Sequence, residues 1–244
     1  MAIANRNTLT QHDLIPAIIL HRRDYRDNSL LLEFFTPGEG RMPAIARGAK
    51  GGRSSRGAWL QPFAPLLVTL RGRGEIRTLG EVEADGRPYV LNGERLYCGF
   101  YLNELIMRLL QRQDPYPELY RIYLQTLERL ASPVSAEQCL RDFEIQLLQE
   151  LGYGLLLERT ADDGEPVESD AVYHYRIEEG PITGRGGPRE QQIRGRTLLC
   201  LHNRALLDEE GAAEAKRLMR RVLAHYLGGR PLKSRELFQG LKQT

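Results

Sequence analysis

The spacing of apolar residues changes once along this chain, near Gly80. Before that point, strand-like runs with a period of two occupy residues 16–23, 29–36, 41–48, 63–70 and 75–81. Turns rich in glycine and proline separate the runs, and this pattern is typical of short β-strands. Five strands within about eighty residues predict a small Greek-key barrel of the OB-fold type.

After Gly80, apolar residues recur every three or four positions, which predicts amphipathic helices. Four such stripes lie at residues 102–110, 119–130, 140–151 and 212–227. Prolines separate the first three stripes, because proline interrupts a helix. Ser135, with Gln138 three residues later, fits a capping box at the start of the third.

Residues 158–197 differ in character from the helices on either side. They are rich in glycine and acidic residues and contain one strand-like run, residues 172–177. The carboxylates do not have EF-hand spacing, so we interpret the segment as a solvated acidic insertion of irregular structure. The predicted α+β organisation is a barrel at residues 1–80, a helical domain at 81–157 and 198–244, and this insertion.

Positive charge is concentrated in the predicted barrel. Residues 1–80 hold twelve Lys and Arg against six Asp and Glu, whereas the rest of the chain holds twenty-two against twenty-six. Clustered cations attract a polyanion and displace counterions from its phosphates. Nucleic acid is therefore the first partner to consider; the alternative is an arginine-rich surface that contacts only solvent.

The glycine-rich stretch at residues 47–57 carries a cation about every third position, so it could follow a phosphate backbone without reading bases. It does not match the Walker pattern, because Gly52 is followed by Arg53. Trp59, the only tryptophan, could stack on a base or anchor one end of the core. The candidate DNA-binding residues are Arg22, Arg23, Arg41, Arg47, Lys50, Arg53, Arg56, Trp59, Arg71, Arg73 and Arg77.

Few features of the chain indicate catalysis. The three cysteines lie far apart without a C-x-x-C pair, which predicts neither disulfides nor a thiolate zinc site and fits a reducing cytoplasm. The histidines show no H-E-x-x-H spacing, so we expect no enzyme and no catalytic residues. Two alternatives remain: an RNA-binding factor built on the same barrel, and a metal-dependent nuclease using Asp162, Asp163 and Glu165.

Six short motifs follow one another along the chain. They are Tyr25-Arg26-Asp27-Asn28-Ser29, Thr36 to Gly40, Arg47-Gly48-Ala49-Lys50, Leu60-Gln61-Pro62-Phe63, Glu150-Leu151-Gly152-Tyr153 and residues 225–237, which include LGGRPLKSREL. Their order and spacing resemble those of the bacterial DNA repair family RecO over essentially the whole chain. The resemblance implies an N-terminal OB-fold, a helical domain and a small zinc-finger-like insertion.

The same resemblance implies a recombination mediator in DNA repair. Such a protein binds single- and double-stranded DNA, anneals complementary strands and, with RecR and the single-stranded-DNA-binding protein, loads RecA. We expect it in the cytoplasm, associated with the nucleoid. Annealing needs no covalent chemistry, because a basic barrel that screens two polyanionic strands lowers their repulsion.

A second binding site is expected in the helical domain. The resemblance implies that the acidic, apolar-ended tail of the single-stranded-DNA-binding protein docks there, and a groove between amphipathic helices would suit such a peptide. The arginines expected along that groove are Arg108, Arg112, Arg121 and Arg129. The same side chains could instead lie on exposed helix faces, and the sequence favours neither arrangement.

One departure from the family pattern concerns the insertion. Many members carry four cysteines in the region that here spans residues 157–187, and this chain has none there. Carboxylates and a lone His174 cannot replace a tetrahedral set of thiolates. We therefore expect no metal and no cofactor, and an insertion held by packing.

Overall fold

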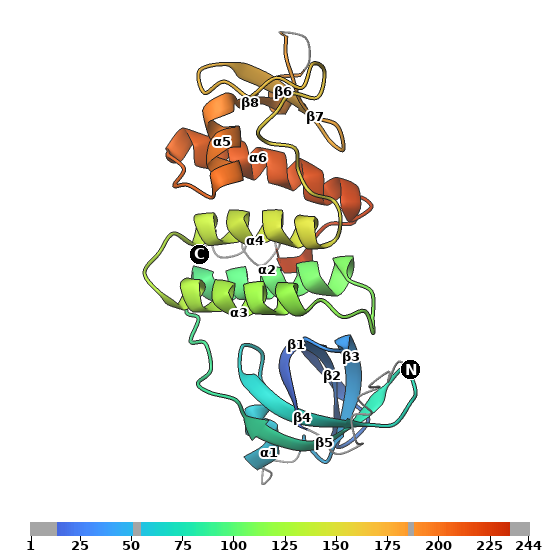
Figure 1. Ribbon diagram of the computed structural model, residues 1–244. Helices are drawn as coiled ribbons and strands as arrows, with labels where there is room; N and C mark the ends of the chain where they lie inside the picture. The colour runs from blue at the N-terminus through green and yellow to red at the C-terminus, as the bar shows by residue number, and fades with distance from the viewer. Residues whose placement is uncertain (1–13, 51–54, 185–187, 235–244) are drawn as a thin grey trace, which may run out of the picture. The chain divides into compact units, whose positions relative to one another are not determined.

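The computed structural model describes residues 14–50, 55–184 and 188–234 (Figure 1). The chain divides into two compact units. The first comprises Met1–Val90 with Gln111–Tyr120, and the second comprises Leu91–Leu110 with Arg121–Thr244. In the described part of the chain, no helix has the length and apolar character needed to cross a bilayer.

The first unit contains a closed five-stranded barrel, which confirms the predicted OB-type fold. Its strands are β1 (Ile15–Tyr25), β2 (Ser29–Thr36), β3 (Gly40–Arg47), β4 (Pro65–Arg71) and β5 (Arg77–Ala84). They follow the order β1–β2–β3–β5–β4, and β1 pairs with β4 to close the barrel. Each strand lies within three residues of its predicted bounds. The β3–β5 pair is parallel, and the other pairs are antiparallel.

Alternation along the strands places one face of each in the barrel core. Leu30, Leu32 and Phe34 of β2 belong to this core, together with Met42 and Ala44 of β3. The period of two that was visible in the sequence is the geometric reason, because successive strand residues point to opposite faces. Small residues such as Ala44 and large ones such as Phe34 together fill the narrow interior of the barrel.

A segment that the sequence did not assign to the barrel belongs to the same unit: Gln111–Tyr120. The ring of Tyr120 packs edge-on against Phe35 of β2, with 5.4 Å between ring centroids. Gly40 has a φ of +65°, and a Cβ at this position would lie 1.9 Å from the carbonyl oxygen of Asp114. Glycine is therefore required where this segment crosses the start of β3.

The glycine-rich stretch predicted as a loop ends in a short helix, α1 (Ser55–Trp59). Gly57 lets α1 approach the chain that precedes it, because a Cβ there would lie 2.4 Å from the carbonyl oxygen of Ala49. Directly after the helix, the carbonyl oxygen of Leu60 accepts a hydrogen bond of 3.1 Å from Arg22 on β1. These two contacts fix α1 on the barrel.

The second unit is built on α2 (Glu94–Leu109), most of α3 (Pro117–Ala131), α4 (Ala136–Glu150), α5 (Gly195–Asn203) and α6 (Glu209–Tyr226). The four predicted stripes correspond to α2, α3, α4 and α6. Ser135 caps α4 by accepting a 3.3 Å hydrogen bond from the backbone N–H of Gln138, as predicted. The sequence did not show α5, because nine residues are too few for a periodic pattern.

The insertion is more regular than the sequence indicated. It contains a three-stranded antiparallel sheet with β6 (Val172–Arg176) between β7 (Gly180–Ile182) and β8 (Gln192–Arg194), plus a 3₁₀ turn, η1 (Arg189–Gln191). The predicted strand at residues 172–177 is β6. Glu214 on α6 holds this sheet, because its carboxylate accepts hydrogen bonds from Arg194, at 3.1 Å, and from the hydroxyl of Thr197.

Candidate nucleic-acid interface

Four of the predicted DNA-binding arginines are exposed and have no hydrogen-bond or ion-pair partner among the described residues: Arg23, Arg47, Arg71 and Arg73. Strand pairing places two of them on the same face of the barrel, on the strands that flank β5. Thr78 on β5 is opposite both Ile45 on β3 and Arg71 at the end of β4, and Arg47 follows Ile45 by two residues. The barrel therefore presents guanidinium groups that do not have to break a described contact before meeting a phosphate.

Lys50 is the other described cation of the glycine-rich stretch. Its Nζ lies 2.8 Å from a carboxylate oxygen of Asp24, and both side chains are exposed. An exposed ion pair of this kind contributes little free energy, so a phosphate can replace Asp24 at small cost. Two further predicted contacts are not placed: Arg53 lies outside the described residues, as does the side chain of Arg56.

Arg41 occupies a different environment from the exposed arginines. Only 9% of the residue is exposed, and its guanidinium lies 2.7 Å from the carboxylate of Glu33. Arg112, from the segment that crosses the barrel, lies 3.2 Å from the same carboxylate. The backbone N–H of Gln113 also donates to the carbonyl oxygen of Arg41, at 3.1 Å. The environment of Arg41 therefore favours a role in fastening this segment to β3.

Two more predicted residues are partly engaged within the barrel. Arg77 donates to the carbonyl oxygen of Gly72 and lies 3.4 Å from the carboxylate of Glu39, which braces the β4–β5 turn. Arg22 bonds to the carbonyl oxygen of Leu60, as described above. A phosphate would have to compete with a protein acceptor at either position.

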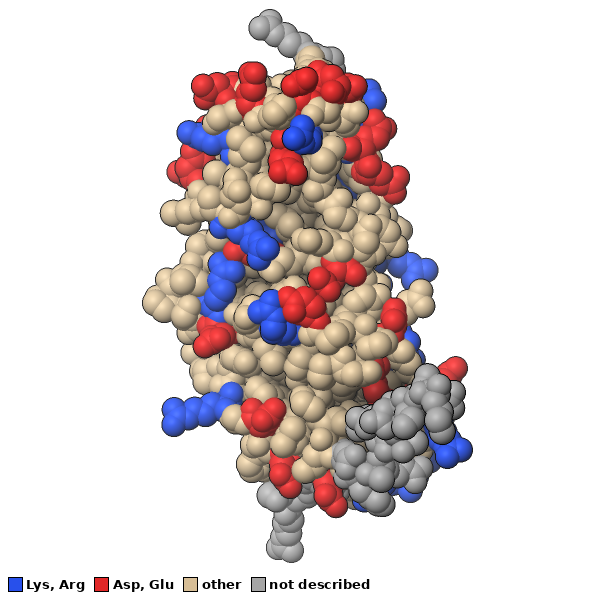
Figure 2. Space-filling model, viewed as in Figure 1, with Lys and Arg blue, Asp and Glu red and all other residues tan. Residues whose placement is uncertain are grey.

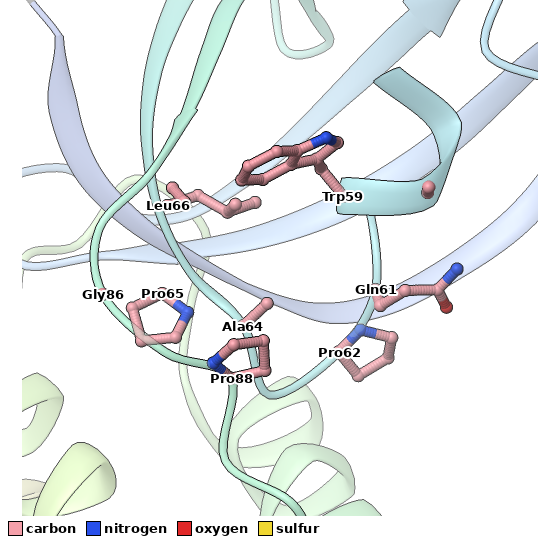
Figure 3. A pocket seen from close by; sticks show the side chains of 10 residues that line it. Trp59, Gln61, Pro62, Ala64, Pro65, Leu66, Gly86 and Pro88 are labelled. Atoms are coloured by element: carbon pink, nitrogen blue, oxygen red, sulfur yellow. The ribbon is translucent and has the colours of Figure 1, made fainter. Parts of the chain in front are cut away.

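Trp59 is not a core residue, since 49% of it is exposed. It stands at the end of α1 and lines a cavity of about 360 Å³. Figure 3 shows the indole on one side of this cavity, with prolines from two other segments on the opposite side. The alternative that Trp59 anchors the end of the barrel core is therefore wrong.

Arg108, predicted to line a peptide groove, binds the chain's own C-terminal segment. It donates to the carbonyl oxygen of Pro231 at 2.9 Å and to that of Leu227 at 3.2 Å. One helical turn earlier on α2, Glu104 accepts hydrogen bonds from the backbone N–H of Lys233 at 2.9 Å and of Ser234 at 2.8 Å. The motif that most resembled the RecO family thus has a structural function on α2.

The other three predicted groove residues have different surroundings. Arg112 belongs to the first unit and pairs with Glu33. Arg129 on α3 lies 2.8 Å from the buried carboxylate of Asp142 on α4. Arg121 lies on the exposed side of α3. The described contacts therefore do not assemble the four arginines into one site.

The resolved pKa shifts of the cysteines reflect burial in the helical unit. Burial, with a smaller contribution from Glu94, raises the pKa of the Cys98 thiol to about 11. Burial likewise raises the pKa of Cys139. Both groups are therefore thiols at neutral pH, which is the state expected of small apolar packing residues.

The insertion does not fit a zinc ion. His174 on β6 is buried, and its Nδ1 has no hydrogen-bond partner in the described part of the chain. No cysteine accompanies it in the insertion, and across the described residues no three His, Cys, Asp or Glu side chains gather as a metal site. A single imidazole is far short of the tetrahedral ligand set that structural zinc requires.

Two of the carboxylates considered for a nuclease, those of Asp162 and Asp163, accept hydrogen bonds within the insertion. Asp162 accepts a 2.5 Å hydrogen bond from the hydroxyl of Thr183, which lowers the pKa of this carboxyl. Asp163 accepts from the hydroxyl of Thr160 and, at 3.2 Å, from the backbone N–H of Glu165. On the face shown in Figure 2, acidic side chains gather over the part of the molecule that carries β6, β7 and β8.

Another arginine of structural importance has no sequence signal. Arg95 on α2 donates to three backbone carbonyl oxygens at the end of α3 and just beyond it: those of Leu130 at 2.7 Å, Ser132 at 2.6 Å and Val134 at 2.8 Å. It thereby satisfies acceptors that a helix end leaves without an internal partner. Its partners lie at least 35 positions away, so local sequence could not reveal them.

The fold and the exposed cations define an OB-barrel protein with a C-terminal helical domain. The sequence also matches two protein-family models, which identify the family. Residues 13–85 match the model described as Recombination protein O N terminal, and residues 91–236 match Recombination protein O C terminal. The chain belongs to the Recombination protein O family.

Curated relatives agree with this assignment over most of the chain. A protein of Methylococcus capsulatus named DNA repair protein RecO is 50% identical over 223 residues, which cover 91% of each chain. A protein of Nitrosococcus oceani with the same name is 46% identical over 231 residues, 94% of each chain. The protein of that name from Yersinia pestis is 46% identical over 224 residues, 91% of this chain and 92% of that one.

Proposed function

We propose that this chain acts in DNA repair and recombination by binding single- and double-stranded DNA through its barrel and promoting strand annealing. One observation carries the proposal: the barrel presents exposed arginines without a partner among the described residues, in a chain of the Recombination protein O family. Guanidinium groups free of internal bonds can bind phosphates and release counterions without first breaking a contact within the protein.

The mechanism is electrostatic. Two complementary strands repel each other through their phosphates, and cations that contact both backbones reduce this repulsion. Phosphate contacts carry no sequence information, so the bases stay available for pairing. Base pairing then supplies the free energy of annealing, and no covalent step is needed.

We further propose that the helical unit receives the acidic tail of the single-stranded-DNA-binding protein, and that RecR and RecA take part in the same process. The exposed Arg121 and the partly exposed Arg129 on α3 support a cationic contact with such a tail. The bonds of Arg108 to the C-terminal segment make it a support for this surface rather than a contact.

An annealing assay tests the proposal. Two complementary oligonucleotides should pair faster with the protein than without it, and the acceleration should fall as salt rises, because salt weakens phosphate contacts. Equal binding of RNA and DNA of the same length, without faster annealing, would favour the RNA-binding alternative. Absence of binding to either would contradict the proposal.

A further inference from the structure

The cavity beside Trp59 is an apolar pocket on a unit otherwise notable for its exposed charge. Its volume is about 360 Å³, and its walls come from α1, the turn that follows it, the start of β4 and the chain after β5. None of the lining side chains is charged, and Gln61 is the only one with an amide group. The pocket therefore suits an uncharged, mainly apolar group.

The shape of the walls favours a flat ring. Figure 3 shows the indole of Trp59 beside Leu66, with Pro65 and Pro88 opposite and Pro62 at one end. An exposed indole face attracts another aromatic ring by stacking, and proline rings form flat apolar surfaces. Proline has no backbone N–H, so this wall has few donors with which to distinguish one ring edge from another.

The chain next to the pocket is cationic. Gly57 of α1 lies against the backbone of Ala49. This contact places α1, and Trp59 at its end, beside the stretch that carries Arg47 and Lys50. Arg47 and Lys50 are exposed, and the only described partner of Lys50 is the exposed Asp24. A ligand that joins a flat ring to an anionic backbone would satisfy both surfaces at once.

We propose that this pocket receives one unpaired nucleobase of a bound single strand, stacked on Trp59, while neighbouring phosphates contact Arg47 and Lys50. The proposal rests on the proposed function and specifies how a single strand is held. A base in this pocket is removed from competition for pairing, so the strand is anchored at one nucleotide while its neighbours stay exposed. Stacking accepts every base, which agrees with a wall that has few donors.

Because Trp59 is the only tryptophan, its fluorescence reports on this pocket alone. An oligonucleotide should quench the emission, whereas an abasic strand of equal length and charge should bind through its phosphates with little quenching. The strand with bases should also bind roughly 5- to 150-fold more tightly, the range expected for stacking of one base.

Two variants separate stacking from charge. Trp59→Ala should remove the preference for bases and leave the dependence of affinity on salt unchanged, because the phosphate contacts remain. Trp59→Phe should retain part of the preference, since it keeps an aromatic ring. Ile76→Ala is the matched control: Ile76 is 47% exposed, is the last residue of the cationic β4–β5 turn and does not line the pocket. It should leave the preference as it is.

The outcomes distinguish this inference from the proposed function. Equal quenching by both strands, or a base preference that survives in Trp59→Ala, would overturn the proposal that the pocket receives a base, and DNA binding by the barrel would still stand. If neither strand binds the wild-type protein, the proposed function fails and the pocket proposal fails with it. The fluorescence comparison uses the unaltered protein, so it stands even if Trp59→Ala folds poorly.

Discussion

Arginine has different surroundings in the two compact units. In the barrel, Arg47 and Arg71 are exposed without a partner among the described residues. In the helical unit, Arg95 and Arg108 donate to backbone carbonyl oxygens, and Arg129 pairs with a buried carboxylate. Arg47 and Arg71 are therefore available for a ligand, as Arg41 of the same barrel is not, whereas Arg95, Arg108 and Arg129 are part of the scaffold of the helical unit.

The difference shows why a count of cations is a poor guide to a binding site. An arginine that already donates to carbonyl oxygens has to give up those bonds before it binds a phosphate, and the buried acceptors then cost free energy. An exposed arginine gives up only water. Function in this molecule is therefore better inferred from what each guanidinium contacts than from local charge density.

The largest effect is expected from removing charge from the barrel. Replacing Arg47, Arg71 and Arg73 together by Gln should weaken single-strand binding on the order of a hundredfold at moderate salt. It should also reduce the slope of log affinity against log salt by about 0.7 for each phosphate that is no longer neutralised. Titrations of a labelled oligonucleotide at several salt concentrations measure both quantities.

A matched triple in the other unit serves as the control for that experiment. Lys216, Arg217 and Arg220 are exposed on α6, with Lys216 in an exposed ion pair of 2.8 Å with Glu137, and replacing them by Gln removes the same charge. Affinity and slope should change little. If the two triples weaken binding equally, the barrel is not a distinct site and the comparison between the units no longer holds.

Arg95→Ala should affect stability and leave DNA binding unchanged. Removing a charged donor to three carbonyl oxygens should cost about 2 kcal/mol of unfolding free energy, measured by urea denaturation. Arg95→Lys should recover only part of this, because one ammonium group cannot reach three acceptors as a planar fork does. Arg220→Ala, at an exposed position, should stay near wild type; a similar destabilisation there would argue against a special role for Arg95.

A smaller effect is expected for the acidic tail peptide. Arg121→Glu combined with Arg129→Gln should weaken its binding by about tenfold, and the remaining affinity should depend less on salt. Glutamine is preferred at position 129 because a carboxylate there would repel the buried Asp142. Calorimetry with the peptide measures this, and single-strand DNA affinity is the control. Equal weakening of both activities would indicate one shared basic surface.

Most of the fold could be predicted from the sequence, because periodicity is a local property of the chain. The alternation that places Leu30, Leu32 and Phe34 in the core is visible without a structure. The segment Gln111–Tyr120 could not be assigned to the barrel, since its contacts with Phe35 and Gly40 join positions far apart in the chain.

The candidate site was less predictable for the same reason. Arg41 and Arg47 are both on β3, six residues apart, and strand alternation places both on the face opposite Met42 and Ala44. Only the covering segment makes them different, since it brings Arg112 to Glu33 beside Arg41 and leaves Arg47 exposed. The exposure of Trp59 likewise depends on how α1 meets the barrel.

The smallest effect is expected from removing metal ions, because the insertion is fastened by charge rather than by thiolates. The carboxylate of Glu214 joins Arg194 and Thr197 to α6, and no cysteine lies in residues 157–187. A chelator should therefore leave the thermal midpoint unmoved, whereas Glu214→Gln, which removes the charge and keeps the shape, should lower it. A structural zinc would contribute about 10 kcal/mol or more, so its removal would be obvious in the same melting experiment. Stoichiometric zinc in the purified protein, or a midpoint that falls with chelator, would show that the chain holds a metal through ligands other than a set of four cysteines.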